Sequence, residues 1–232
     1  NNKFLPKKKI LDKYDKIICI SENTKNDLLY YYEVDEKKIS VIHLGYPDKK
    51  KNLFKIDIKP YILFVGTRWK YKNFFNLIKA YNRNKNLVRD FNIVCFGGGK
   101  FTQEEKNEIK SLGLKNDKII QIDGNDKLLH SYYKSASLFV YPTLYEGFGL
   151  PILESFLYDC PVACSKTSSL PEVAGSGAMY FDPKNIDNIT DVLTKILYSN
   201  SKKEELVEKA RVQLNKFSWK DCANKTLNFY KT

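Results

Sequence analysis

Two glutamates with seven residues between them, Glu146 and Glu154, bracket the stretch of sequence best suited to chemistry. The residues between them include two glycines and Pro151, followed by apolar residues at helical spacing. We therefore expect a glycine loop that opens a helix with Pro151 in its first position. Such a helix start favours phosphate, and a glutamate can accept hydrogen bonds from both hydroxyls of a diol. This pattern suits a nucleotide sugar, which has a diol at each end and phosphate between. The alternative is a capped helix whose carboxylates complement its dipole, and spacing alone does not decide.

A second group of polar residues follows another expected strand. Residues 61–65 form an apolar run typical of a parallel strand buried on both faces, and Gly66, Arg68 and Lys72 come after it. Open parallel sheets bind ligands beyond the carboxyl ends of their strands. Arginine can bind a phosphate in bidentate fashion, whereas lysine acts as a point charge. An ordinary basic loop is the competing interpretation.

Both stretches resemble motifs of a known family. Residues 146–154, Glu-Gly-Phe-Gly-Leu-Pro-Ile-Leu-Glu, resemble the E-x7-E signature of the retaining glycosyltransferases of family four, which have the GT-B fold. The resemblance implies that Glu154 holds the ribose hydroxyls of a nucleotide sugar and that Glu146 contacts the donor sugar. It also implies that backbone amides face the sugar and the diphosphate, namely those of Gly147, Phe148, Gly149 and Leu150.

Residues 66–73 are similar to the family's second motif, in which a lysine before Asn or Gly binds the donor diphosphate. Lys72 matches that lysine. The family often has Arg directly after the glycine, where this chain has Thr67, so Arg68 is the candidate for that role. The resemblance thus implies catalytic roles for Glu146, Lys72 and Arg68. The implied donor contacts also include Gly66, Thr67 and, beside the nucleobase, Ile122, Asp123 and Gly124.

The strand and helix patterns predict an α/β fold with an open, mostly parallel, Rossmann-like sheet of about six strands and helices on both faces. We expect residues 46–216 to form this Rossmann-like domain, and the resemblance implies that the domain binds the nucleotide sugar. The resemblance implies that residues 1–45 are the end of an acceptor-binding domain and the crossing into the donor domain. It implies that residues 217–232 form a helix that packs on that acceptor domain. Because the rest of the acceptor domain is missing, we expect donor binding with little or no transfer.

The resemblance further implies transfer from a nucleoside diphosphate sugar to a glycan or lipid-linked acceptor, with retention, without a metal and without a cofactor beyond this co-substrate. No Asp-x-Asp, P-loop or cluster of metal ligands occurs in the sequence. His43 and His130 are expected to be packed or surface residues, and Glu172 to be structural. Gly97, Gly98 and Gly99 predict a tight turn.

The net charge of +12 leaves three classes of partner open: nucleic acid, an anionic membrane surface, or an anionic small substrate. No apolar run reaches the ~18 residues of a membrane span, and the start does not resemble a signal peptide. Five cysteines, mostly in apolar runs, indicate buried thiols in a reducing compartment. We therefore expect a cytoplasmic protein, with peripheral contact at the inner membrane face left open.

Two other functions compete with the enzyme. One is a non-catalytic subunit that uses the same pocket. The other is a basic nucleic-acid-binding protein, which is weakly supported because the aromatic residues lie at core positions and no recognition motif occurs. The sequence does not name the sugar, the base or the acceptor.

Overall fold

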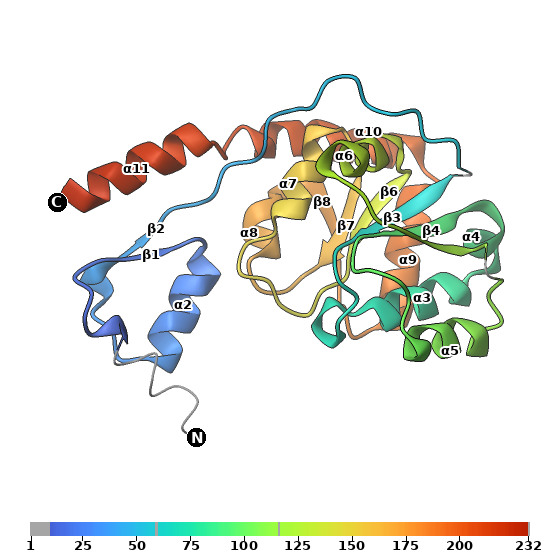
Figure 1. Cartoon of the computed structure of the whole chain (residues 1–232), viewed down its shortest axis with the longest axis horizontal. Coiled ribbons are helices and arrows are strands. Elements are labelled where there is room, and N and C mark those ends of the chain that lie inside the picture. The colour runs from blue at the N-terminus through green and yellow to red at the C-terminus, as the bar shows by residue number, and fades with distance from the viewer. Residues whose placement is uncertain (1–9, 59, 116, 232) are drawn as a thin grey trace.

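Two parallel sheets organise the residues that the computed structural model describes, which are 10–58, 60–115 and 117–231 (Figure 1). The smaller sheet pairs β1 (Ile17–Cys19) with β2 (Ile39–Val41), and α2 (Glu22–Tyr31) and the 3-10 turn η1 (Glu36–Lys38) connect them. The larger sheet contains β3 (Tyr61–Val65), β4 (Asn92–Phe96), β5 (Ile119–Ile122), β6 (Leu138–Tyr141), β7 (Val162–Ser165) and β8 (Ala178–Phe181).

The six strands of the larger sheet lie in the order β5-β4-β3-β6-β7-β8, and every neighbouring pair is parallel. The predicted open parallel sheet is therefore confirmed. The chain builds outward from β3 in one direction and then returns to β6 and builds in the other. In such a sheet the helices that follow the two central strands lie on opposite faces, and ligands bind in the crevice beyond the ends of these strands. Here these strands are β3 and β6.

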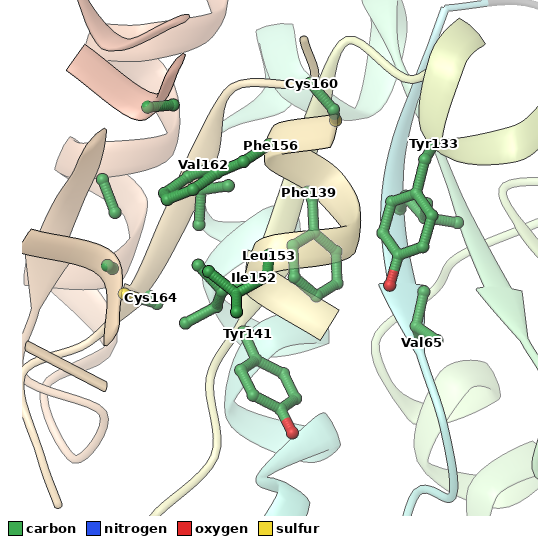
Figure 2. Close-up of a cluster of buried hydrophobic side chains, with 14 of the residues drawn as sticks. Val65, Tyr133, Phe139, Tyr141, Ile152, Leu153, Phe156, Cys160, Val162 and Cys164 are labelled. Carbon is green, nitrogen blue, oxygen red and sulfur yellow. The ribbon is translucent and has the colours of Figure 1, made fainter. Parts of the chain in front are cut away.

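The apolar strands are buried on both faces because each face is covered by helices. Tyr61, Leu63 and Val65 of β3 belong to one core cluster, whereas Ile62 and Phe64 belong to the other, as the alternation of side chains along a strand requires. The first cluster, part of which Figure 2 shows, lies under α6 (Asp126–Ser135), α7 (Leu150–Leu157), α8 (Leu170–Ala174) and α10 (Asn200–Leu214). The second lies under α3 (Phe74–Arg83), α4 (Lys85–Asp90), α5 (Gln103–Ser111) and α9 (Ile186–Leu197).

Most helix starts follow local signals in the sequence. Ser21 caps α2 by accepting from the amide of Thr24, and Asn125 caps α6. Two details differ from the prediction. Helix α7 begins at Leu150, one residue before Pro151. Helix α4 was not predicted, because its six residues bury only one apolar side chain and so carry no periodic signal.

The segment after β2 passes close to the C-terminal helix α11 (Trp219–Lys231) before it reaches the large sheet (Figure 1). A side chain at Gly45 would place its Cβ 2.1 Å from the amide nitrogen of Trp219, so only glycine allows this approach. None of the residues of α11 is buried. The expected limits at 1–45 and 217–232 stay predictions, and residues 1–9 and 232 lie outside the described residues.

Four of the five cysteines are buried, as expected, and Cys222 is half-buried. Within the described part of the chain, no helix combines the length and the apolar character that crossing a bilayer requires.

Candidate active site

An ion pair between Lys72 and Glu146 lies at the crevice between the two halves of the large sheet. The Nζ atom of Lys72 is 2.7 Å from Oε1 of Glu146, and both side chains are largely shielded from solvent, with exposed fractions of 13% and 16%. Lys72 follows β3, in the 3-10 turn η2 (Lys70–Lys72), and Glu146 follows β6. Lys72 also donates to the hydroxyl of Tyr141, the last residue of β6, at 3.1 Å. The fold thus joins two residues that are 74 positions apart.

The two loops that carry this pair are tied together through their backbones. The carbonyl of Tyr71 accepts from the amide of Leu144 at 2.7 Å and from the hydroxyl of Thr143 at 3.1 Å. Asn73, in the left-handed region, directly precedes α3 and donates from its side chain to the carbonyl of Pro142 at 3.0 Å. Because these contacts fix the loops to each other, the geometry of the Lys72–Glu146 pair is built into the fold. Sequence reasoning missed these contacts, since none of them joins near neighbours.

The backbone of the glycine loop is held through its carbonyl groups. Ser169 donates its hydroxyl to the carbonyls of Glu146 at 2.9 Å and Phe148 at 2.8 Å. The carbonyl of Gly147 accepts hydrogen bonds from the hydroxyl of Ser21, which caps α2, and from the hydroxyl of Thr24 in α2. By contrast, within the described residues no hydrogen bond uses the amides of Gly147, Phe148 or Gly149. These three N–H groups precede the first turn of α7, and unpartnered amides at a helix start favour an anion.

Glu154 lies on α7 behind this loop and accepts a hydrogen bond of 3.0 Å from the hydroxyl of Tyr133 on α6. Burial raises the pKa of Glu154, and the bond from Tyr133 acts in the opposite direction. Burial is the main cause that raises the pKa of Tyr141, and the negative charge of Glu146 adds to it. In Figure 2 the rings of Tyr133 and Tyr141 lie in the core cluster, and both hydroxyls point to the same edge of it.

Arg68 is buried and surrounded by acceptors of the protein itself. Its Nε donates to Glu105 at 2.8 Å and its Nη1 to the carbonyl of Gly97 at 2.9 Å. Its Nη2 donates to the carbonyls of Gly98, Gly99 and Lys100. A diphosphate contact from Arg68 stays a prediction, and these contacts favour a role in holding the turn after β4.

The other predicted donor contacts lie at the same edge of the sheet. Gly66 uses its amide within the sheet, donating to the carbonyl of Phe96 at 2.9 Å, and Ile122 uses its carbonyl to accept from Gly97 at 2.8 Å. Thr67, Asp123 and Gly124 are exposed where β3 and β5 end. All the predicted site residues therefore follow or end β3, β5 or β6, or lie in α7: Gly66, Thr67, Arg68, Lys72, Ile122, Asp123, Gly124, Glu146, Gly147, Phe148, Gly149, Leu150 and Glu154.

A pocket of about 430 Å³ opens beside the ion pair and is lined by Tyr71, Tyr145, Glu146 and Gly147. It is large enough for a sugar ring, and Glu146 gives it a hydrogen-bond acceptor. Among the described residues, no group of three or more His, Cys, Asp or Glu side chains is placed to hold a metal ion.

The comparison with known proteins identifies the family of the chain. The profile of the family described as "Glycosyl transferases group 1" matches residues 46–213. The "O-antigen chain mannosyltransferase B" of Escherichia coli is 33% identical over 173 residues, which cover 74% of this chain and 45% of that protein. The "O-antigen chain mannosyltransferase RfbU" of Salmonella typhimurium is 29% identical over 192 residues, covering 77% and 53%. This chain thus spans about half the length of these relatives.

A solved structure shares the fold. The crystal structure of HepE from Anabaena in complex with UDP-glucose has a TM-score of 0.83 with this chain, at 13% identity, and the match covers 98% of this chain and 67% of that one. A likeness at this identity concerns the fold alone. The family profile, by contrast, covers most of the chain, including the glycine loop and the Lys72–Glu146 pair. The chain therefore belongs to the group 1 glycosyltransferases, which confirms the resemblance to the GT-B enzymes.

Proposed function

We propose that this chain is the donor-binding part of a glycosyltransferase that takes a sugar from a nucleoside diphosphate sugar and transfers it with retention. The observation that carries the proposal is the shielded Lys72–Glu146 pair beside three amides, at the start of α7, that have no partner among the described residues. A cation and a helix start together favour a diphosphate, and the neighbouring carboxylate suits the hydroxyls of a sugar.

In this proposal the diphosphate is the leaving group. Its negative charge grows as the glycosidic bond breaks, so preorganised donors aimed at it stabilise the transition state more than the bound substrate. Lys72 supplies a full positive charge, and the amides of Gly147, Phe148 and Gly149 supply dipoles. Because these groups provide the electrostatic stabilisation, the reaction runs without a metal. Arg68 shapes the site by holding the turn of residues 97–100.

In this proposal the two glutamates bind opposite ends of the donor. Glu146 lines the 430 Å³ pocket and accepts from hydroxyls of the sugar, while its pairing with Lys72 orients the ammonium group. Glu154 accepts from the ribose hydroxyls, and the hydrogen bond from Tyr133 orients its carboxylate. Thr67, Ile122, Asp123 and Gly124 line the nucleotide side.

The acceptor would be a glycan or a lipid-linked sugar chain. Two relatives that are named O-antigen chain mannosyltransferases support a mannosyl donor and a polysaccharide product. Because the chain spans about half their length, we propose that a further domain binds the acceptor and that this chain alone binds the donor without transfer. A lipid-linked acceptor would place the enzyme in the cytoplasm against the inner membrane face, where a charge of +12 attracts anionic lipids.

A panel of nucleoside diphosphate sugars that includes GDP-mannose and UDP-glucose, measured by thermal shift and calorimetry, tests the proposal. A ligand at 100 times its Kd should stabilise the folded chain by about 2.7 kcal/mol. The Lys72→Met variant is the control and should lose most of this shift. If no nucleotide sugar or free nucleoside diphosphate stabilises the wild-type chain at millimolar concentration, the donor-binding role is wrong. Robust transfer by the 232-residue chain alone would refute the need for a further domain.

A further inference from the structure

A carboxylate of α8 lies at the first turn of α2, 150 positions earlier in the chain. The amide of Glu22 donates to both oxygens of Glu172, at 2.9 and 3.0 Å, and the amide of Asn23 lies 3.4 Å from Oε2. The first amides of a helix have no partner within the helix, and the helix dipole favours an anion there. Glu172 thus binds the N-terminus of α2 as an external cap.

Glu172 also contacts the segment that joins the small sheet to the large one. The Nε2 atom of His43 lies 2.5 Å from Oε1 of Glu172. The ring of His43 packs against the rings of Phe148 and Phe217, with centroids 6.0 and 5.6 Å apart. One side chain of α8 therefore joins α2, the crossing segment and, through His43, the glycine loop.

The turn that Glu172 holds also contacts the carbonyl group of Gly147. The hydroxyl of Ser21 donates to that carbonyl at 2.7 Å, and the hydroxyl of Thr24 donates to it at 3.1 Å. The peptide bond is planar and trans, so the direction of the Gly147 carbonyl sets the opposite direction of the Phe148 amide. Phe148 is one of the three residues whose amides have no partner in the described chain.

We propose that Glu172 is a positioning residue for donor binding, and this inference rests on the proposed function. By holding the first turn of α2 in place, Glu172 keeps Ser21 and Thr24 on the Gly147 carbonyl and so aims the Phe148 amide at the donor phosphate. Neither Glu172 nor α2 needs to touch the donor. Loss of the carboxylate frees the turn, and the peptide between Gly147 and Phe148 can then rotate.

The Glu172→Gln variant tests this role, because it keeps the size of the side chain and removes the charge. A favourable charge at a partly buried helix terminus can change an equilibrium constant about tenfold. We therefore expect about fivefold to tenfold weaker binding of the best donor of the panel. Amide hydrogen exchange should become faster at residues 22–24, and the backbone amide chemical shifts of residues 147–149 should change. The Asp35→Asn variant, which changes an exposed cap of η1 in the same small unit, should leave all of these values unchanged.

A double-mutant cycle with Thr24→Val separates positioning from plain stability. Thr24→Val removes one of the two hydroxyl bonds to Gly147 without touching Glu172, and it provides the readout if Glu172→Gln folds poorly. If Glu172 acts through this turn, the effects of the two substitutions on donor affinity are not additive. Faster exchange at residues 22–24 with unchanged amide chemical shifts at residues 147–149 and unchanged affinity would overturn the proposal. If the wild-type chain binds no nucleotide sugar, the donor-binding role fails, whereas the amide chemical shifts of residues 147–149 still decide whether Glu172 holds the loop.

Discussion

Replacing Glu154 with Gln should separate what this residue does for binding from what it does for stability. The side chain lies on α7, largely buried, with one oxygen accepting from the hydroxyl of Tyr133 at 3.0 Å. Gln keeps the size of the side chain and one acceptor oxygen but removes the negative charge. We expect the substitution to weaken ligand binding and not to lower folding stability, because the negative charge favours the ligand but opposes burial of the side chain.

The binding loss follows from the hydrogen bonds. A hydrogen bond to a charged group contributes about 1.5–3 kcal/mol, and Gln retains one acceptor of the two that a ribose diol needs. Losing one such bond should weaken nucleoside diphosphate binding roughly 10- to 150-fold, since each 1.4 kcal/mol is a factor of ten. Calorimetry at neutral pH measures this change. A 2′-deoxy nucleotide should show a smaller difference between the variant and the wild-type chain.

The stability effect has the opposite sign. Burial raises the pKa of Glu154 in the folded state, so its contribution is favourable below the unfolded pKa of about 4.3 and is lost as the pH rises through the folded pKa. Ionisation of this side chain therefore opposes folding. The melting temperature of Glu154→Gln at pH 7 should equal or exceed that of the wild-type chain, and part of the pH dependence of stability above pH 4 should disappear.

The Tyr133→Phe variant is the matched control. It removes the hydrogen bond that lowers the pKa of Glu154, so that pKa should rise further. Donor affinity should then decrease on acidification at a higher pH than in the wild-type chain. Unchanged nucleotide affinity together with a lower melting temperature in Glu154→Gln would refute the reasoning and make Glu154 a structural residue.

Three further substitutions address the loops around the site. Lys72→Met should raise the Kd for a nucleoside diphosphate sugar at least about tenfold in calorimetry, because it removes the only full charge assigned to the diphosphate, and a change below twofold would contradict that role. Arg68→Met should lower the free energy of unfolding in urea by about 3–5 kcal/mol, because it leaves buried Glu105 unpaired, whereas a small loss would indicate that Arg68 is free to serve the ligand. Gly149→Ala should cost about 1–3 kcal/mol in the same assay, since its φ is +116° and its Cβ would lie 3.0 Å from a methyl group of Leu170, and wild-type stability would refute the strain.

The sequence by itself determined the sheet, most of the helices and the position of the glycine loop. These features depend on near neighbours: apolar runs for buried strands, Ser21 and Asn125 as caps, and glycines before an apolar helical stripe. The parallel sheet then required the loops after β3 and β6 to meet at one edge. For that reason Lys72 and Glu146 could be assigned to one site although 74 residues separate them. The six-residue helix α4 was not predicted because a single buried side chain produces no helical periodicity in the sequence.

The tertiary structure alone decided which partner each polar side chain has. The sequence predicts Arg68 in a ligand-binding loop. In the structure its guanidinium instead donates hydrogen bonds to Glu105 and to the four carbonyls of residues 97–100. Likewise, nothing near Glu172 in the sequence points to the amides of α2, and nothing near Glu154 points to Tyr133. A hydrogen-bond donor is satisfied by whatever acceptor packing brings within about 3 Å, and packing joins segments that are far apart along the chain.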